Sequence, residues 1–277
     1  MNNNLKSRLK KQLYFLRKKP NFFIAGVRKG GTTSLFSYLD QHIDISLPRH
    51  KEIFYFSIYH DKPYSWYRSR FPFIWKKGLT GEATPGYLFH PKAPERISAK
   101  YPNAKVIFLL RDPVQRAMSN FEMNRKLGWE DAMTFEAAIE RELTGTPEIY
   151  DFPHGFSKSY TPFTHIHAYL WQGLYAHHLA NWYGHFNKGQ ICILDSHDLF
   201  SRPRQTLHRV HDFLGVAHTV PQDLQARNVG SYTNTALPTS LYEEICAYFN
   251  KDYSTLRRKY IKNGCDWIDN YIGHEQK

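Results

Sequence analysis

A short segment between Gly26 and Ser34, which reads GVRKGGTTS, combines residue types that bind anions. Its paired glycines let backbone N–H groups turn toward a ligand, and a helix that begins here adds partial positive charge. Arg28 and Lys29 bring full positive charges to the same place. The hydroxyls that can donate to phosphate oxygens belong to Thr32, Thr33 and Ser34. The spacing predicts a phosphate-binding turn between a strand and a helix.

The loop departs from the G-x-x-x-x-G-K-[ST] pattern of nucleotide triphosphatases and kinases. Gly26 and Gly31 have the required spacing, but Thr32 follows where that pattern has its lysine. Lys29 stands two residues before the second glycine instead. The apolar run 105–110 is followed by an arginine and not by a metal-binding acid. Both departures argue against magnesium-dependent phosphoryl transfer, and a P-loop small-molecule kinase is kept as an alternative.

Apolar runs and helical patterns alternate along the chain. Buried strands are predicted at residues 22–27, 105–110 and 190–194. Helical patterns follow them at residues 32–39, 114–125 and 198–214, and further ones cover 165–186 and 238–260. Asp198 is the expected N-cap of its helix, and residues 144–164 and 218–237 are predicted loops. This alternation is typical of an α/β fold with a central parallel sheet flanked by helices.

The chain is expected to have two parts. Residues 1–20 are basic and carry leucines at helical spacing, which predicts an amphipathic segment. Its apolar side either docks on the rest of the protein or lies on a membrane surface. Residues 21–277 show no repeat and no linker, so they are expected to form a single domain.

Charge and composition restrict the partners and the location. Lys and Arg total 37 and Asp and Glu total 25, which gives a formal net charge of +12 and suits an anionic ligand, polymer or surface. No nucleic-acid-binding motif accompanies this charge, so nucleic acid is not expected. No apolar run approaches the ~20 residues of a membrane span, and three scattered cysteines are typical of a reducing compartment. We therefore expect a cytoplasmic protein.

Several segments together resemble a known family. The segment RKGGTTSL is similar to the 5′-phosphosulfate loop of sulfotransferases that use 3′-phosphoadenosine-5′-phosphosulfate (PAPS) and release adenosine 3′,5′-bisphosphate (PAP). The similarity extends through KEIFYF, WYRSRFP, GEATPGYLF and LLRDPVQRAMSNF, and more weakly through GLYAHHLANW and NVGSY. These segments most resemble the heparan-sulfate-type branch, and within it the glucosaminyl 3-O-sulfotransferases. The resemblance implies sulfuryl transfer from PAPS to an acceptor hydroxyl, with a P-loop-like phosphosulfate-binding loop in the predicted α/β domain.

The resemblance also implies roles for individual residues. Glu52 matches the catalytic base, with His50 as the rival candidate, and Lys29 is expected to stabilise charge on the leaving 5′-phosphate. The residues implied at the 5′-phosphate are Arg28, Lys29, Gly30, Gly31, Thr32, Thr33 and Ser34. The resemblance implies that Arg111 and Ser119 bind the 3′-phosphate, together with Arg227 and Gly230. Trp66 and Tyr67 are candidates for binding the acceptor, and we expect the aromatic residues near Glu52 to shield its carboxylate from water.

One departure from the family concerns the acceptor. Ala83 stands where heparan-sulfate-type enzymes usually carry a lysine, which puts a heparan acceptor in doubt and leaves a glycan or a small natural product. A non-catalytic protein that binds PAPS or a polyanion is a further alternative. No metal is expected, because histidine pairs such as His165/His167 and His177/His178 lack the spacing of a metal site. The sequence does not indicate an oligomeric state.

Overall fold

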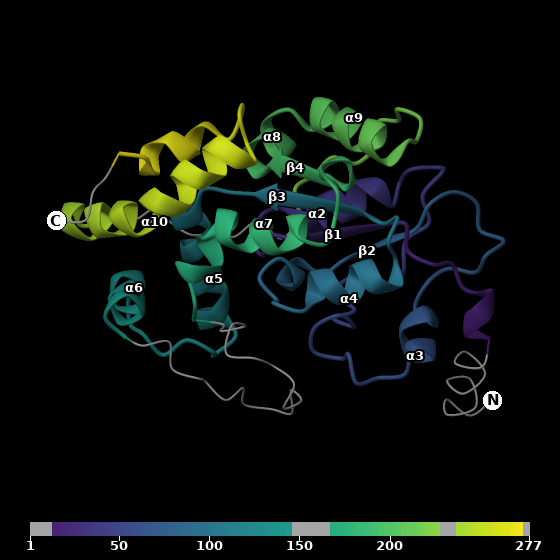
Figure 1. Cartoon of the computed structure of the whole chain (residues 1–277), viewed down its shortest axis with the longest axis horizontal. Coiled ribbons are helices and arrows are strands. Elements are labelled where there is room, and N and C mark those ends of the chain that lie inside the picture. Colours follow the sequence, from purple (N-terminus) through teal and green to yellow (C-terminus); the bar gives the residue numbers. More distant parts are fainter. Residues whose placement is uncertain (1–12, 146–166, 228–236, 274–277) are drawn as a thin grey trace.

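The computed structural model describes residues 13–145, 167–227 and 237–273. In this part of the chain, four strands form one parallel sheet with the order β2-β1-β3-β4 (Figure 1). The strands are β1 (Phe22–Gly26), β2 (Gly81–Ala83), β3 (Lys105–Leu110) and β4 (Ile191–Asp195). The predicted α/β fold with a central parallel sheet is confirmed.

Helices cover both faces of this sheet. Those of the first half of the chain are α2 (Thr32–Leu39), α3 (Tyr64–Arg68), α4 (Ala93–Lys100), α5 (Pro113–Lys126) and α6 (Phe135–Thr144). Those of the second half are α7 (Tyr175–Tyr183), α8 (Ser196–Ser201), α9 (Pro203–Leu214) and α10 (Thr239–Lys259). Short 3₁₀ turns complete the described elements: η1 (Tyr14–Leu16), η2 (Pro85–Tyr87), η4 (Trp171–Gly173), η5 (Lys188–Gln190) and η6 (Asp266–Tyr271).

The strands are apolar on both sides because each face of the sheet is covered. Successive strand residues point to opposite faces, so Phe23 of β1 packs in one core with residues of α4, α5, α7 and α10. Its neighbour Ile24 packs in the other core with residues of α2, α8 and α9. In Figure 1 the sheet accordingly lies between α8 and α9 on one side and α4, α5 and α7 on the other. The layered arrangement brings the carboxyl ends of the parallel strands to one edge.

Two of the predicted helices are wrong in their extent. The stretch 198–214 is two helices, because Pro203 begins α9 as a separate helix. The N-cap is Asp195, whose side chain accepts a hydrogen bond from the His197 N–H, and not Asp198. The stretch 165–186 contains only η4 and the nine residues of α7 within its described part.

Other regions were not predicted or cannot be compared. Strand β2 has three residues, too few for a periodic pattern, and was missed. Of residues 1–20, the described part contains η1, after which Arg17 forms a bridge with Phe73. Residues 1–12 and most of the predicted loop 144–164 lie outside the described residues.

A buried carboxyl group on β2 predicts a pH dependence of stability. Burial raises the pKa of Glu82 to about 8, and the nearby hydroxyls of Tyr67 and Tyr87 only partly offset this. Between about pH 5 and 8 the unfolded chain therefore binds fewer protons than the native one, and the native state loses stability as the pH rises. The variant Glu82→Gln has no charge to bury. The difference between its free energy of unfolding and that of the wild type should therefore shift in favour of the variant by on the order of 4 kcal/mol between about pH 5 and 8.

Urea unfolding of both proteins at several pH values would measure this difference. Glu140→Gln, which changes an exposed glutamate of α6, is the matched control. Its free energy of unfolding should differ from that of the wild type by the same amount at every pH. A wild type and a Glu82→Gln variant with parallel pH profiles would contradict the prediction.

Candidate active site

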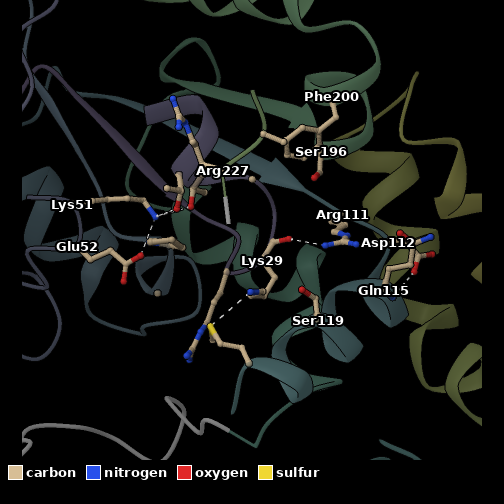
Figure 2. A pocket seen from close by; sticks show the side chains of 18 of the residues that line it. Lys29, Lys51, Glu52, Arg111, Asp112, Gln115, Ser119, Ser196, Phe200 and Arg227 are labelled. Carbon is tan, nitrogen blue, oxygen red and sulfur yellow. Dashed lines mark hydrogen bonds and ion pairs between the residues drawn. The ribbon is translucent and has the colours of Figure 1, made fainter. Parts of the chain in front are cut away.

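A cavity of about 1110 Å³ lies at the carboxyl edge of the sheet. Its walls come from the segments that follow all four described strands, together with residues of α5, α8 and η6. Figure 2 shows Lys51 and Glu52 on one side, Lys29 in the middle, and Arg111 with Ser119 on the other side. Residues predicted as a base and as an anion-binding set therefore face one cavity.

The glycines of the loop after β1 are required by its geometry. A Cβ atom on Gly30 would lie 2.5 Å from the Leu109 carbonyl oxygen, which is closer than such atoms approach. Gly31, the N-cap of α2, has a φ of 91°, a conformation that favours glycine. The N–H of Gly30 donates to the Val27 carbonyl at 3.0 Å and so stabilises the turn itself. Gly30 thus allows the loop to pack against β3, and its N–H group is engaged within the turn. Its predicted contact with phosphate stays a prediction.

Lys51 connects the glycine loop to the predicted base. Its Nζ donates hydrogen bonds to the Oγ1 atoms of Thr32 at 3.1 Å and Thr33 at 3.0 Å, and to Glu52 Oε1 at 2.9 Å. The N–H of Glu52 donates to the Ala83 carbonyl at 2.9 Å, which fixes its backbone beside β2. The Glu52 side chain is 41% exposed, so the expected shielding by aromatic residues is wrong. An ammonium group holds this carboxylate at the loop.

Lys51 is a residue that the sequence interpretation missed. The signal was present, because Lys51 directly precedes the predicted base. Adjacent residues commonly point in different directions, and only the loop conformation brings both side chains to one place; Glu52 has a φ of 62°. Position 83 is a buried alanine, and Lys51 brings an ammonium group to the glycine loop from another segment.

Arg111 and Ser119 lie together on the other side of the cavity (Figure 2). Arg111 follows β3, and its Nη1 donates to the Lys29 carbonyl at 3.1 Å. Asp112 caps α5 by accepting from the Gln115 N–H at 2.8 Å and also accepts from the Tyr271 hydroxyl at 2.7 Å. The capped helix directs Ser119, two turns along, into the cavity. A cation and a hydroxyl are thus placed for a second anionic group.

The segment after α9 contributes Arg227. The Arg227 N–H donates to Ser34 Oγ at 2.9 Å, and its guanidinium forms an ion pair with Asp223. Arg227 lines the cavity, whereas Ser34 is fully buried and does not line it. Ser34 therefore positions Arg227, and the structure does not bring its hydroxyl, which is predicted to contact phosphate, to the cavity wall. Gly230 lies outside the described residues.

The predicted acceptor contacts are not brought to the cavity. Tyr67 is fully buried in the aromatic core, where its ring stacks on Tyr55 at a centroid distance of 4.5 Å. Trp66 is half-buried, lies under the Arg70 guanidinium at 3.8 Å, and does not line the cavity. His50, the rival base, is exposed and also outside the lining. Packing explains both aromatic residues, and Glu52 remains the candidate base.

The electrostatics of the site favour an anionic ligand. Burial lowers the pKa of Lys29, and the charges of Arg28, Arg111, Lys126 and Lys51 lower it further. Such mutual repulsion among cations is relieved when a phosphate or sulfate group lies between them. Over residues 13–145, 167–227 and 237–273, no group of three or more His, Cys, Asp or Glu side chains is arranged to hold a metal ion.

The walls near Arg111 include residues that are far apart in the sequence. Ser196 and Phe200 of α8 and Trp267 of η6 line the cavity. Phe200 packs against the loop, because a Cβ atom on Gly31 would lie 3.0 Å from its ring. The Trp267 indole N–H donates to Asp195 at 3.2 Å. The sequence carried no signal for these residues, because only the parallel sheet brings β4 and the C-terminal segment beside the glycine loop.

Comparisons with known proteins agree with this arrangement. The family profile described as sulfotransferase domain matches residues 19–259. A mouse heparan sulfate glucosamine 3-O-sulfotransferase 3B1 is 34% identical over 201 residues, which are 73% of this chain and 47% of the relative. A mouse heparan sulfate glucosamine 3-O-sulfotransferase 6 is 32% identical over 206 residues, 74% of this chain and 54% of the relative. The chain spans about half the length of these relatives.

A solved structure covers nearly the whole chain. The crystal structure of a sulfotransferase from Alicyclobacillus acidocaldarius has a TM-score of 0.72 and 27% sequence identity, and the match covers 91% of this chain and 99% of that one. The resemblance inferred from the motifs is thus confirmed. With the profile matching from before β1 to the last residue of α10, the chain belongs to the sulfotransferase family.

Proposed function

We propose that this chain is a PAPS-dependent sulfotransferase that transfers a sulfuryl group to a hydroxyl of a glycan or a small natural product. The observation that carries the proposal is the convergence of Lys29, Lys51 and Glu52 at the glycine loop (Figure 2). A phosphate-binding protein needs the loop and the cations, but it does not need a carboxylate beside them. A carboxylate that faces the same cavity supplies the base that an acceptor hydroxyl requires.

The residues of the loop fit the 5′ end of the co-substrate. Thr32 and Thr33 line the cavity at the start of α2, where the helix presents unpaired N–H groups and partial positive charge. Lys29 and Arg28 line the same region. We assign the 3′-phosphate to Arg111 and Ser119, which line the other side of the cavity, with Arg227 as a further cation on its wall. The two groups of cations match a ligand with two separate anionic ends.

Each catalytic side chain has one task in an in-line transfer. PAPS supplies the sulfuryl group, whose bond to the 5′-phosphate oxygen breaks as a bond to the acceptor oxygen forms. Glu52 accepts the acceptor proton, and Lys51 keeps its carboxylate in place through the 2.9 Å contact. Lys29 donates to the oxygen that bridges sulfur and phosphorus and stabilises the negative charge that develops there. The negative charge that develops during transfer is thus stabilised by side chains and backbone dipoles of this chain.

Replacing Arg111 by alanine tests the assignment of the 3′-phosphate site. The variant loses a charge-assisted hydrogen bond to that phosphate, so PAP should bind more weakly by about 2–4 kcal/mol. Adenosine 5′-monophosphate lacks the 3′-phosphate and should lose much less. Calorimetric titration of wild type and variant with both nucleotides measures the difference.

Arg111 also donates to the Lys29 carbonyl, so its loss could distort the glycine loop and weaken the binding of any nucleotide. Comparing the two nucleotides separates this effect from the loss of a contact with the 3′-phosphate. Arg204→Ala, on the exposed side of α9, is the matched control and should bind both nucleotides normally. Equal losses for PAP and the monophosphate would remove Arg111 from the 3′-phosphate site. Thermal stabilisation by ATP with Mg²⁺ but not by PAP would favour the kinase alternative.

In the described part of the chain, no helix is both long and apolar enough to pass through a membrane. The cytoplasmic location expected from the sequence stays a prediction, and fractionation of cells that express the protein would test it.

A further inference from the structure

The cavity is large enough for two ligands, and its two halves differ in chemistry. Its volume of about 1110 Å³ exceeds the roughly 300–1,000 Å³ typical of a pocket for one ligand. The half around Arg111 is lined by polar and charged groups such as Asp112, Gln115 and Ser119, together with the rings of Phe200 and Trp267. If this half and the glycine loop hold PAPS, as proposed above, the half beyond Glu52 is left for the acceptor.

The acceptor half is built from apolar side chains. The residues that form it, here called the acceptor wall, are Phe54, Ile58, Tyr59, Phe89, Met123 and Trp129. Three of them belong to the turn that carries Glu52, which is closed by hydrogen bonds from the Ser57 and Tyr59 N–H groups to the Phe54 carbonyl. Met123 lies between the acceptor wall and the place where the sulfuryl group is transferred, because its sulfur is 3.7 Å from Lys29 Nζ. The acceptor wall therefore adjoins both the base and the main cation.

The apolar character continues to the surface beyond α5. The Trp129 N–H donates to the Asn124 carbonyl at 2.9 Å, which folds this tryptophan back against the helix end. Trp129 lines the cavity and is 39% exposed, while Leu127 and Met133 of the same segment are 50% and 80% exposed. An exposed apolar ring that lines a cavity, as Trp129 does, is a feature of binding sites for apolar ligands.

Among the described residues that line the cavity, the positively charged ones belong to the glycine loop, to Lys51, to Arg227 and to the Arg111 side, and the acceptor wall has none. Lys126, whose charge acts on Lys29, follows Met123 on α5 but does not line the cavity. Lys51 is engaged with Thr32, Thr33 and Glu52, and Arg28 and Lys29 belong to the glycine loop. A sulfated polysaccharide would require cations spaced along the surface that it occupies, since each sulfate must be neutralised or remain in water. The described residues of the acceptor wall offer rings and aliphatic groups instead, which favour the flat apolar face of an uncharged ligand.

We propose that the acceptor is an uncharged hydroxyl compound with a predominantly apolar body, such as a phenol or a fused-ring alcohol. This inference rests on the proposed sulfuryl transfer and narrows its acceptor. The acceptor oxygen forms a bond to sulfur, the bond from sulfur to the 5′-phosphate oxygen breaks, and the acceptor proton passes to Glu52. The products are a sulfate monoester and PAP, so no oxidant or reductant is involved.

The test compares two acceptors with the full chain and PAPS: 2-naphthol and an N-sulfated glucosaminyl oligosaccharide. Product is identified by mass spectrometry, and PAP binding is measured separately by calorimetry. We expect kcat/KM for 2-naphthol to exceed that for the oligosaccharide by at least roughly tenfold, the discrimination that one apolar contact can provide. A preference for the oligosaccharide, or transfer to neither compound, overturns the inference.

A pair of tryptophan variants locates the acceptor. Trp129→Ala removes a ring of the acceptor wall and should lower kcat/KM for 2-naphthol by roughly tenfold, mainly through KM, while PAP affinity stays unchanged. Trp75→Ala removes a ring that is 63% exposed, stacks on Phe73 and does not line the cavity, so it should leave kcat/KM unchanged. Equal behaviour of the two variants overturns the placement.

The outcomes also separate this inference from the proposed function. If PAP binds and the oligosaccharide is sulfated, the function stands and the acceptor class is wrong. If PAP does not bind and no product forms, the proposed function itself has failed.

Discussion

Glu52→Gln should lower kcat by about 10²- to 10⁴-fold, the usual contribution of a general base. The amide has the shape of the carboxylate but cannot take the acceptor proton. Its oxygen can still accept from Lys51, which lies 2.9 Å from Glu52 Oε1, so the site should keep its geometry. PAP affinity should therefore stay close to wild type. Steady-state kinetics at saturating PAPS, combined with calorimetry, would measure both quantities.

Two neighbouring variants serve as controls for this prediction. His50→Ala changes an exposed residue outside the cavity lining and should leave kcat unchanged. Lys51→Met keeps the base but removes the ammonium that holds it, so kcat should fall by less than in Glu52→Gln, and Lys51→Arg should recover part of the loss. A normal kcat in Glu52→Gln together with a large loss in His50→Ala would transfer the role of base to the histidine.

The parts of the fold that the sequence predicted are those with a strong local pattern. Helix α2 and strand β3 have the predicted limits, because a glycine turn or an apolar run bounds each of them. The single helix predicted over 198–214 is wrong because Asp195, and not Asp198, caps the first helix through a local hydrogen bond from the His197 N–H, and because Pro203 begins a second helix. Strand β2 forms only by pairing with β1, since three residues are too few to show an alternating apolar pattern. Local patterns thus located α2, α5 and α10, whereas α4 and α6 were not predicted although they have eight and ten residues, and pairing decides the short strand β2.

The same distinction applies to the site. Lys29, Glu52 and Arg111 were predicted from motifs that lie beside the strand ends, and all three line the cavity. Ser34 and Tyr67 belong to equally suggestive segments but point into the protein, and only the packing of neighbouring elements reveals this. Motifs identify a segment that carries chemistry, whereas burial decides which of its side chains reaches the ligand.

Lys29→Ala should lower kcat by about 10²-fold or more, the effect of removing one preorganised electrostatic donor. The negative charge on the bridging oxygen is small in the ground state and grows as the bond to sulfur breaks. An interaction that strengthens in the transition state affects kcat more than affinity. PAP binding should weaken less, because Thr32 and Thr33 at the start of α2 and the cations Arg28 and Arg111 still line the cavity. Rates at saturating PAPS and calorimetric affinities would test the two expectations.

The structure adds a condition to this test. Lys51 Nζ already lies 3.0 Å from Thr33 Oγ1, so a second ammonium stands beside the loop and can carry part of the charge stabilisation. We therefore expect the double variant Lys29→Ala/Lys51→Met to fall below either single variant, while Lys29→Arg restores little, because a planar guanidinium is larger and differently directed. A Lys29→Ala enzyme with a normal kcat and a raised KM for PAPS would contradict the assignment. In that case Lys29 only binds the co-substrate, and the charge on the leaving oxygen would have to be stabilised by Lys51 from the opposite side of the loop.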